Sequence, residues 1–142
     1  LLDTSDVAGR FQIVERFLLD EFRGLLDFNP CVAFAINEMT RRPDALSIAR
    51  MNDTIGYSKK HFAEMFRRQV GVTPKSYLRI MRFQKAVRTI DASGDINWGQ
   101  IALECGFYDQ SHFIHDFKHF SGFTPEEYSK IHTNYQNYIP VG

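Results

Sequence analysis

One stretch of this sequence occurs twice, and the repetition limits what the chain can fold into. His61-Phe62 and Phe66 recur as His112-Phe113 and Phe117, 51 positions further along. The same offset relates Gly71, Thr73-Pro74 and Tyr77 to Gly122, Thr124-Pro125 and Tyr128. Upstream of the turn glycines the offset is 50, so the second copy has one extra residue in its turn. A pattern that repeats in this way indicates that one supersecondary unit is present twice.

The first copy has the pattern of two short helices joined by a turn. Ser47 is a typical N-cap, and apolar residues follow it at helical spacing up to Ile55. Gly56 permits a sharp turn, and Ser58 can cap a second helix that ends at Gly71. The apolar stripe of that second helix consists of Phe62, Met65, Phe66 and Val70. This arrangement predicts a helix-turn-helix over about residues 47–70.

The second copy predicts the same motif over about residues 97–121. Asn97 caps its first helix, Gly106 makes the turn, and Asp109 caps its second helix. The buried stripe of that second helix consists of Phe113, Phe117 and Phe120. Gly122 ends it, and Thr124-Pro125 starts a final helix.

Between the two units, Pro74 to about Ile90 has the pattern of one linking helix, followed by a turn-rich loop at 91–95. We therefore predict an all-α fold of about seven helices, with two helix-turn-helix subdomains joined by a long linking helix. A further amphipathic helix is expected near the N-terminus, with an apolar stripe of Phe11, Val14, Leu18, Phe22 and Leu25.

The charge of the chain is zero as a total but uneven along its length. Seventeen Lys and Arg balance seventeen Asp and Glu among 142 residues, which at first argues against nucleic acid as a partner. Residues 58–88, however, hold nine Lys and Arg against one Glu, between acidic segments at 1–29 and 89–142. Such asymmetry favours a polyanionic partner, although an ordinary solvated helix face would give the same count.

The outward faces of the two second helices carry the candidate DNA contacts. At ~100° per residue, Lys60, Ala63, Glu64 and Arg67 lie opposite the apolar stripe of the first. The offset places Ser111, Ile114, His115 and Lys118 on the equivalent face of the second. Side chains of these types can contact base edges in a major groove. Phosphate contacts are expected from flanking residues, which are Lys59, Arg68, Arg82 and His119.

Other kinds of site find less support in the sequence. His112, His115 and His119 form one helical stripe, but no carboxylate or Cys nearby is an obvious further ligand, so we predict no metal and no cofactor. The phenylalanine stripes have the spacing of a core rather than of an aromatic binding groove. No nucleophile elbow, phosphate-binding glycine loop or Cys/His arrangement indicates an enzyme. Two cysteines without metal or disulfide spacing fit a reduced intracellular compartment. No apolar run is long enough to cross a membrane, and no secretory signal is present.

These residues resemble the DNA-binding domain of the AraC/XylS family of bacterial transcription regulators. The second unit carries the resemblance through Ile101-Ala102-Leu103-Glu104-Cys105-Gly106-Phe107, Ser111-His112-Phe113, Phe117-Lys118, Gly122-Phe123-Thr124-Pro125 and Tyr128. The first unit agrees through Gly56-Tyr57-Ser58, Phe66-Arg67, Gly71-Val72-Thr73-Pro74 and Tyr77-Leu78. The resemblance covers roughly residues 31–131.

The resemblance implies sequence-specific binding of double-stranded operator DNA, with each second helix in one of two successive major grooves. The base-reading positions then fall on Lys60, Ala63, Glu64, Arg67, Gln110, Ser111, Ile114 and His115, and Lys118 joins the phosphate contacts. It also implies a cytoplasmic protein that contacts RNA polymerase and dimerises through a separate N-terminal domain. We expect the DNA-binding domain at 30–132 and a loosely ordered tail at 133–142. Residues 1–29 would be the trailing edge of a sensing domain truncated at Leu1, or a helix that covers the DNA-binding domain.

Two departures from the family pattern bear on function. The small residue usual in the first helix of each unit is Ala102 in the second copy but Asn52 in the first, where it needs a hydrogen-bond partner. The second unit is poor in Lys and Arg but has three His, which suggests that His115 or His119 gains a proton on meeting a phosphate. The competing interpretation is a helical protein-interaction module that reads no bases.

Overall fold

The computed structural model describes residues 16–17, 29–92 and 96–136. The last two ranges contain seven helices and no strand. The helices are α2 (Pro30–Arg41), α3 (Ile48–Ile55), α4 (Lys59–Val70), α5 (Pro74–Ala92), α6 (Trp98–Glu104), α7 (Gln110–Ser121) and α8 (Pro125–Gln136). The predicted all-α fold is confirmed. None of the helices in these ranges has the length and apolar character needed to cross a membrane.

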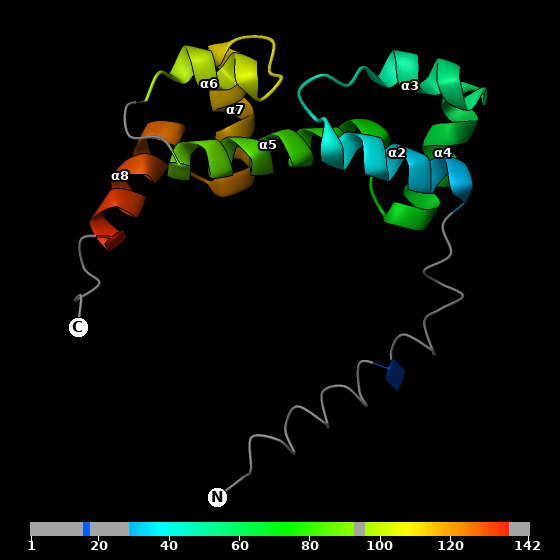
Figure 1. Cartoon of the computed structure of the whole chain (residues 1–142), viewed down its shortest axis with the longest axis horizontal. Coiled ribbons are helices and arrows are strands. Elements are labelled where there is room, and N and C mark those ends of the chain that lie inside the picture. Colours follow the sequence, from blue (N-terminus) through cyan, green and yellow to red (C-terminus); the bar gives the residue numbers. More distant parts are fainter. Residues whose placement is uncertain (1–15, 18–28, 93–95, 137–142) are drawn as a thin grey trace, which may run out of the picture.

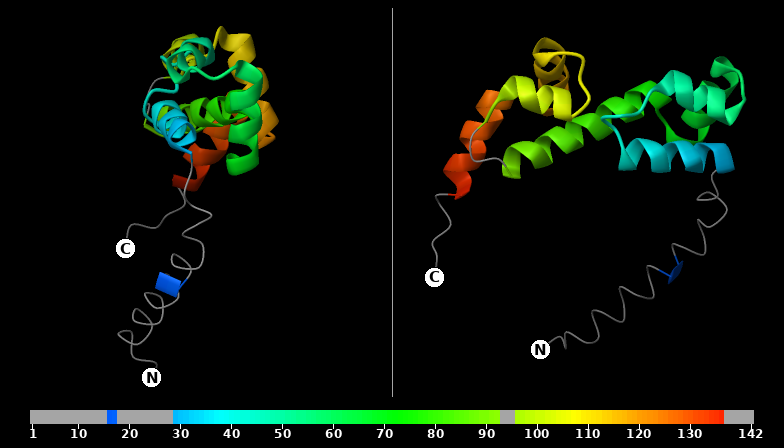
Figure 2. Two further views of the ribbon diagram at one scale, coloured as in Figure 1. Left: turned by 90° about the vertical axis from the view of Figure 1, so that its right-hand side faces the viewer. Right: turned by 45° about the horizontal axis from the view of Figure 1, so that its top comes forward.

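α5 runs through the middle of the molecule and separates two groups of helices (Figures 1 and 2). Its 19 residues make it the longest helix described, roughly 28 Å at ~1.5 Å per residue. α2, α3 and α4 gather at one end of α5, and α6, α7 and α8 gather at the other. The predicted arrangement of two helix-turn-helix units on a linking helix is therefore present.

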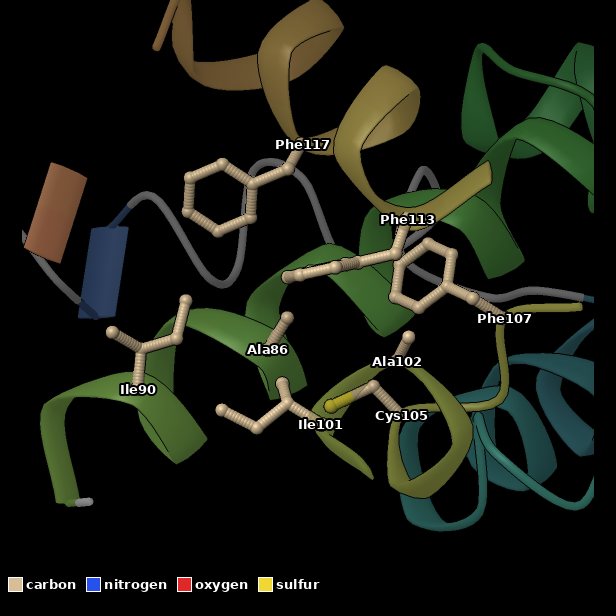
Figure 3. Packing of buried hydrophobic residues seen from close by; sticks show 8 residues of the cluster. All are labelled: Ala86, Ile90, Ile101, Ala102, Cys105, Phe107, Phe113 and Phe117. Atoms are coloured by element: carbon tan, nitrogen blue, oxygen red, sulfur yellow. The ribbon is translucent and has the colours of Figure 1, made fainter. Parts of the chain in front are cut away.

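Each group of helices has its own hydrophobic core. The buried residues of the first core are Val32, Ala35, Met39, Met51, Phe62, Phe66 and Leu78. Those of the second are Ala86, Ile90, Ile101, Ala102, Cys105, Phe107, Phe113 and Phe117, and their packing is drawn in Figure 3. The central aromatic residues predicted for α4 and α7 are thus core residues, and they fill the space against α5 in both units.

The helices begin where the sequence predicts capping residues. Ser58 accepts a hydrogen bond from the backbone N–H of His61, and Asp109 accepts one from that of His112 at 2.7 Å. Ser47 and Asn97 cap α3 and α6 in the same way. Because side-chain acceptors at these positions satisfy otherwise unpaired N–H groups, the starts of α4 and α7 are fixed locally.

The helix ends differ from the sequence predictions in two places. α5 continues to Ala92, so Asp91 and Ala92 are helical rather than part of the predicted loop, and residues 93–95 lie outside the described ranges. α8 continues to Gln136, so helix occupies the first four positions of the tail expected at 133–142. The apolar stripe predicted near the N-terminus lies outside the described residues.

Asn52 lies in the first core without a hydrogen-bond partner for its Oδ1 among the described residues. Asn52 is only 8% exposed, and the equivalent residue of the second core, Ala102, is fully buried. A buried amide oxygen that has lost its water and gained no donor destabilises the folded state. The partner that the sequence analysis required for Asn52 Oδ1 is therefore not found in the described part of the chain.

We expect Asn52→Ala to raise the free energy of unfolding by about 1 kcal/mol, because removing the unpaired oxygen outweighs the small cavity it leaves. Urea denaturation followed by circular dichroism measures the change. The matched control is Ala102→Asn, which places the same amide in the second core and should destabilise the chain by about 2 kcal/mol. A destabilising Asn52→Ala would contradict the inference that the unpaired oxygen costs more free energy than the cavity.

Candidate nucleic-acid interface

The outward face of α4 is polar, exposed and rich in positive charge. Lys60, Glu64 and Arg67 are exposed, whereas Ala63 is half-buried beside them. Lys59 and Arg68, predicted as phosphate contacts, are exposed on the same helix. No carboxylate of the described residues forms an ion pair with any of these four cations, so their charges are available to an external anion.

The outward face of α7 is exposed but less charged. Gln110, Ser111 and His115 are exposed, as are the predicted phosphate contacts Lys118 and His119. Ile114 differs from them because it is half-buried, packs against the second core and lines a pocket with Trp98 and Pro125. Of the predicted reading positions on α7, Ile114 therefore presents the least free surface.

The two helices α4 and α7 lie on the same side of the molecule. In Figure 1 α7 passes behind α5 and α4 passes behind α2, and in the end-on view of Figure 2 both lie to the right of α5. A rod that carries two exposed helices on one side can meet one face of a duplex with both. The structure thus places the two helices that carry the predicted reading residues on one side of α5.

An ion pair between Arg79 of α5 and Asp116 of α7 holds the second exposed helix in place. Arg79 Nε donates to Asp116 Oδ2 at 2.9 Å, and Arg79 Nη2 donates to Oδ1 at 2.7 Å. The Arg79 guanidinium also lies 5.4 Å from the centre of the Phe120 ring. A two-point contact of this kind fixes orientation as well as distance, so it sets the rotation of α7 about its own axis.

Asp116 is charged in the folded chain although it is only 2% exposed. Burial by itself raises the pKa of this carboxyl, but hydrogen bonds from Arg79 and His115 and the charges of Arg79 and His112 outweigh it and hold the pKa below its usual range. His112 Nε2 and His115 Nδ1 each lie 3.4 Å from an Asp116 oxygen. Two of the three predicted stripe histidines therefore flank this carboxylate.

That histidine stripe is not arranged as a metal site in the part of the chain that the structure describes. No group of three or more His, Cys, Asp or Glu side chains there could hold a metal ion. His119 instead packs edge-on against Phe120, with ring centres 5.0 Å apart.

Arg82, predicted as a phosphate contact, is engaged inside the molecule. Its Nε donates to the carbonyl oxygen of Pro43 at 2.9 Å, and its Nη2 donates to that of Leu46 at 3.3 Å. Burial lowers the pKa of Arg82, against the opposing charges of Asp44 and Asp116. These contacts engage two of the five N–H donors of the guanidinium inside the molecule, so we leave Arg82 out of the phosphate contacts proposed below.

Sequence reasoning missed several residues at this interface. Arg79 was counted only as a charge, yet an acid at position 116 between the buried Phe113 and Phe117 is a signal that a buried cation must meet it. Tyr57 and Tyr108 were also missed. They directly precede the caps of α4 and α7, are related by the repeat offset of 51, and are 41% and 87% exposed.

Comparison with known proteins places this architecture in a family. Residues 51–131 match the family model described as a helix-turn-helix domain. Over 83 residues the chain is 30% identical to an uncharacterized HTH-type transcriptional regulator of Staphylococcus aureus, which covers 58% of this chain and 11% of that protein. Over 79 residues it is 34% identical to the HTH-type transcriptional regulator YidL of Escherichia coli, or 56% of this chain and 26% of YidL. The chain thus spans only a small part of the length of these relatives.

Solved structures of the same fold are also similar. The C-terminal domain of AraT, a response regulator from Geobacillus stearothermophilus, superposes with a TM-score of 0.68 at 20% identity, over 73% of this chain and 87% of that one. The DNA-binding domain of AdpA, a global transcriptional factor solved in complex with a target DNA, superposes with a TM-score of 0.66 at 21% identity, over 80% of this chain and all of that one.

Replacing Asp116 by Asn is expected to lower the free energy of unfolding by about 3 kcal/mol near pH 7, because a buried ion pair loses one partner. Since the pKa of Asp116 is lowered in the folded chain, the pair contributes fully above the ordinary carboxyl pKa and is lost as pH falls through the lowered value. The difference between parent and variant should therefore shrink below about pH 4.

Urea denaturation at several pH values measures this difference. Glu126→Gln, which breaks the exposed pair with Lys130, serves as the control and should change little at any pH. A deficit of Asp116→Asn that stays undiminished in acid would show that the carboxylate charge is not what stabilises α7.

Proposed function

The chain belongs to the family of AraC-type helix-turn-helix domains, and from this premise we propose that it regulates transcription by binding double-stranded DNA sequence-specifically through both of its units. In this proposal α4 and α7 lie in successive major grooves on one face of the duplex. The observation that carries it is the duplicated geometry. Each unit has a capped helix with a buried aromatic back and an exposed polar front, and both of these helices lie on one side of α5.

The exposed residues of α4 and α7 have chemistry suited to base edges. On α4, Lys60 and Arg67 can donate to guanine, Glu64 can accept from cytosine, and Ala63 can meet a thymine methyl group. On α7, the reading residues are Gln110, Ser111 and His115. Ile114 can make only an apolar contact, and its partial burial reduces the surface available for it. The second unit therefore reads more through amides, hydroxyls and imidazole than through cations.

Phosphate contacts are proposed for Lys59, Arg68, Lys118 and His119, which are exposed beside the reading residues. Their charges position the domain without reading sequence. The exposed Tyr57 and Tyr108 stand at the entry of each helix, where a phenol can donate to a phosphate oxygen. This surface supports a binding role rather than an enzymatic one.

Regulation requires partners beyond DNA. We propose a cytoplasmic regulator that contacts RNA polymerase and that pairs with a second copy through a domain preceding the described residues. The family membership supports the DNA-binding part of this proposal most directly, because the relatives are described as transcriptional regulators.

The central test is selection of bound sequences from a random duplex library by the 142-residue chain. We expect one long asymmetric site with two elements about one helical turn apart. With four phosphate contacts, affinity should fall roughly a hundredfold between about 50 and 200 mM salt. Lys60→Ala/Arg67→Ala should lose most preference for the selected site, because both side chains are assigned to bases.

The matched control is Arg88→Ala/Lys130→Ala, which removes two exposed cations that have no part in the proposal. It should bind the selected site with the parent's preference over unrelated DNA. A shallow salt slope, with binding that survives Lys60→Ala/Arg67→Ala, would instead favour the helical protein-interaction module. Recovery of a single short element would mean that only one unit reads DNA.

The histidines of α7 predict a dependence of binding on pH. If His115 or His119 gains a proton on meeting a phosphate, affinity for the selected site should rise as pH falls from about 8 to about 6. Fluorescence anisotropy at constant ionic strength measures the rise, and His115→Gln/His119→Gln should abolish it. His61→Gln on α4 is the control that should leave it in place. A parent protein whose affinity is flat over this range excludes a histidine contact to phosphate.

A further inference from the structure

The loop between α2 and α3 of the first helix-turn-helix unit contacts the second unit. Its Asp44 lies against Gly106, which stands in the turn after α6 of the second unit. A Cβ built on Gly106 would come within 2.5 Å of Asp44 Cα and 2.8 Å of its carbonyl oxygen. No side chain fits in that space. In Figure 1 this cyan loop approaches the yellow turn that follows α6.

The same loop is tied to the linking helix α5 at three points. Arg82 holds the carbonyl oxygens of Pro43 and Leu46, as described above. Lys85 Nζ lies 2.8 Å from Asp44 Oδ1, and this hydrogen bond lowers the pKa of Asp44. Arg82 and Lys85 are about one helical turn apart on α5, so both bind the loop from the same face of that helix.

The turn of the first unit makes no equivalent contact with the described residues. Gly56 has the same left-handed conformation as Gly106, with φ of 79° against 85°, but no atom of the described residues lies within 4 Å of a Cβ built there. Conformation alone therefore explains glycine at 56, whereas close packing is a second requirement at 106. The difference marks Gly106 as a contact between units rather than only a turn residue.

This contact gives the two units a second connection beside α5. Their hydrophobic cores are separate, and a single helix between them can bend and twist. The loop at residues 43–46 restricts this motion, because it is bound to α5 on one side and packs against the turn after α6 on the other. The relative placement of α4 and α7 then depends on this contact as well as on how each unit packs on α5.

We propose that the loop at residues 43–46, held by Arg82 and Lys85 and seated on Gly106, is the positioning element that fixes which spacing of operator elements the protein accepts. The inference rests on the proposed DNA binding through both units. Each added base pair moves one groove relative to the other by about 3.4 Å and about 35°. A braced pair of helices cannot follow such a shift, whereas an unbraced pair can.

The test compares binding to the selected operator with binding to versions that carry one base pair more or one fewer between the two elements. We expect the parent to lose about tenfold or more in affinity on either shifted operator. The readout is the affinity for the selected operator divided by the affinity for each shifted operator. A variant that is merely less stable binds all three operators more weakly by the same factor, so it leaves this ratio unchanged.

Two variants loosen the brace in different ways. Gly106→Ala introduces the clash with Asp44, and Gly56→Ala is its control because it has the same backbone strain without the clash. Arg82→Met/Lys85→Met releases the loop while keeping apolar stems, and Lys75→Met/Arg88→Met is its control on the same helix. We expect both loosened variants to show ratios below about threefold, or a different preferred spacing, and both controls to keep the parent's ratio.

The outcomes separate the inference from the function on which it rests. A parent chain that selects no duplex overturns the proposed DNA binding itself. A parent that binds the selected and the shifted operators equally well contradicts the role of the loop but not the DNA binding. Variants Gly106→Ala and Arg82→Met/Lys85→Met that keep the parent's ratio also contradict the role of the loop. If Gly106→Ala does not fold, the ratio of Arg82→Met/Lys85→Met alone provides the test.

Discussion

Both hydrophobic cores are closed by the same helix. α5 contributes Leu78 to the first core and Ala86 and Ile90 to the second, so neither unit can bury its aromatic stripe without it. A helix-turn-helix is too small to enclose a core alone, and here the shared wall supplies the missing side twice. The positions of both exposed helices therefore follow from how each unit packs on α5, with Arg79 and Asp116 adding an oriented contact on one side.

Much of the fold could be predicted because its signals are local. Ser58 and Asp109 cap helices within three residues of themselves, and the left-handed glycines 71 and 122 end them. Helical spacing was enough to assign Phe62, Phe66, Phe113 and Phe117 to cores. The same reasoning predicted that Lys60, Glu64 and Arg67 lie on an exposed face of α4, and all three are exposed.

What could not be predicted depends on partners far away in sequence. Arg79 and Asp116 are 37 positions apart, and Arg82 meets the carbonyl of Pro43 from 39 positions away. A basic residue on a helix has the same local pattern whether it meets solvent, a phosphate or an internal carbonyl. The duplication also conceals differences between its copies, since Asn52 and Ala102 occupy equivalent places with opposite polarity, and Gly56 and Gly106 share a conformation but not a neighbour.

The separation of the two cores has a consequence for how long the proposed complex with DNA would last. Because each unit closes its own core against α5, local unfolding of one unit breaks its contact with the other but leaves the other core packed. In the proposed complex, the released helix would remain close to its groove, at a high effective concentration, and would rebind before the whole protein escapes. Dissociation would then require the release of both units at the same time.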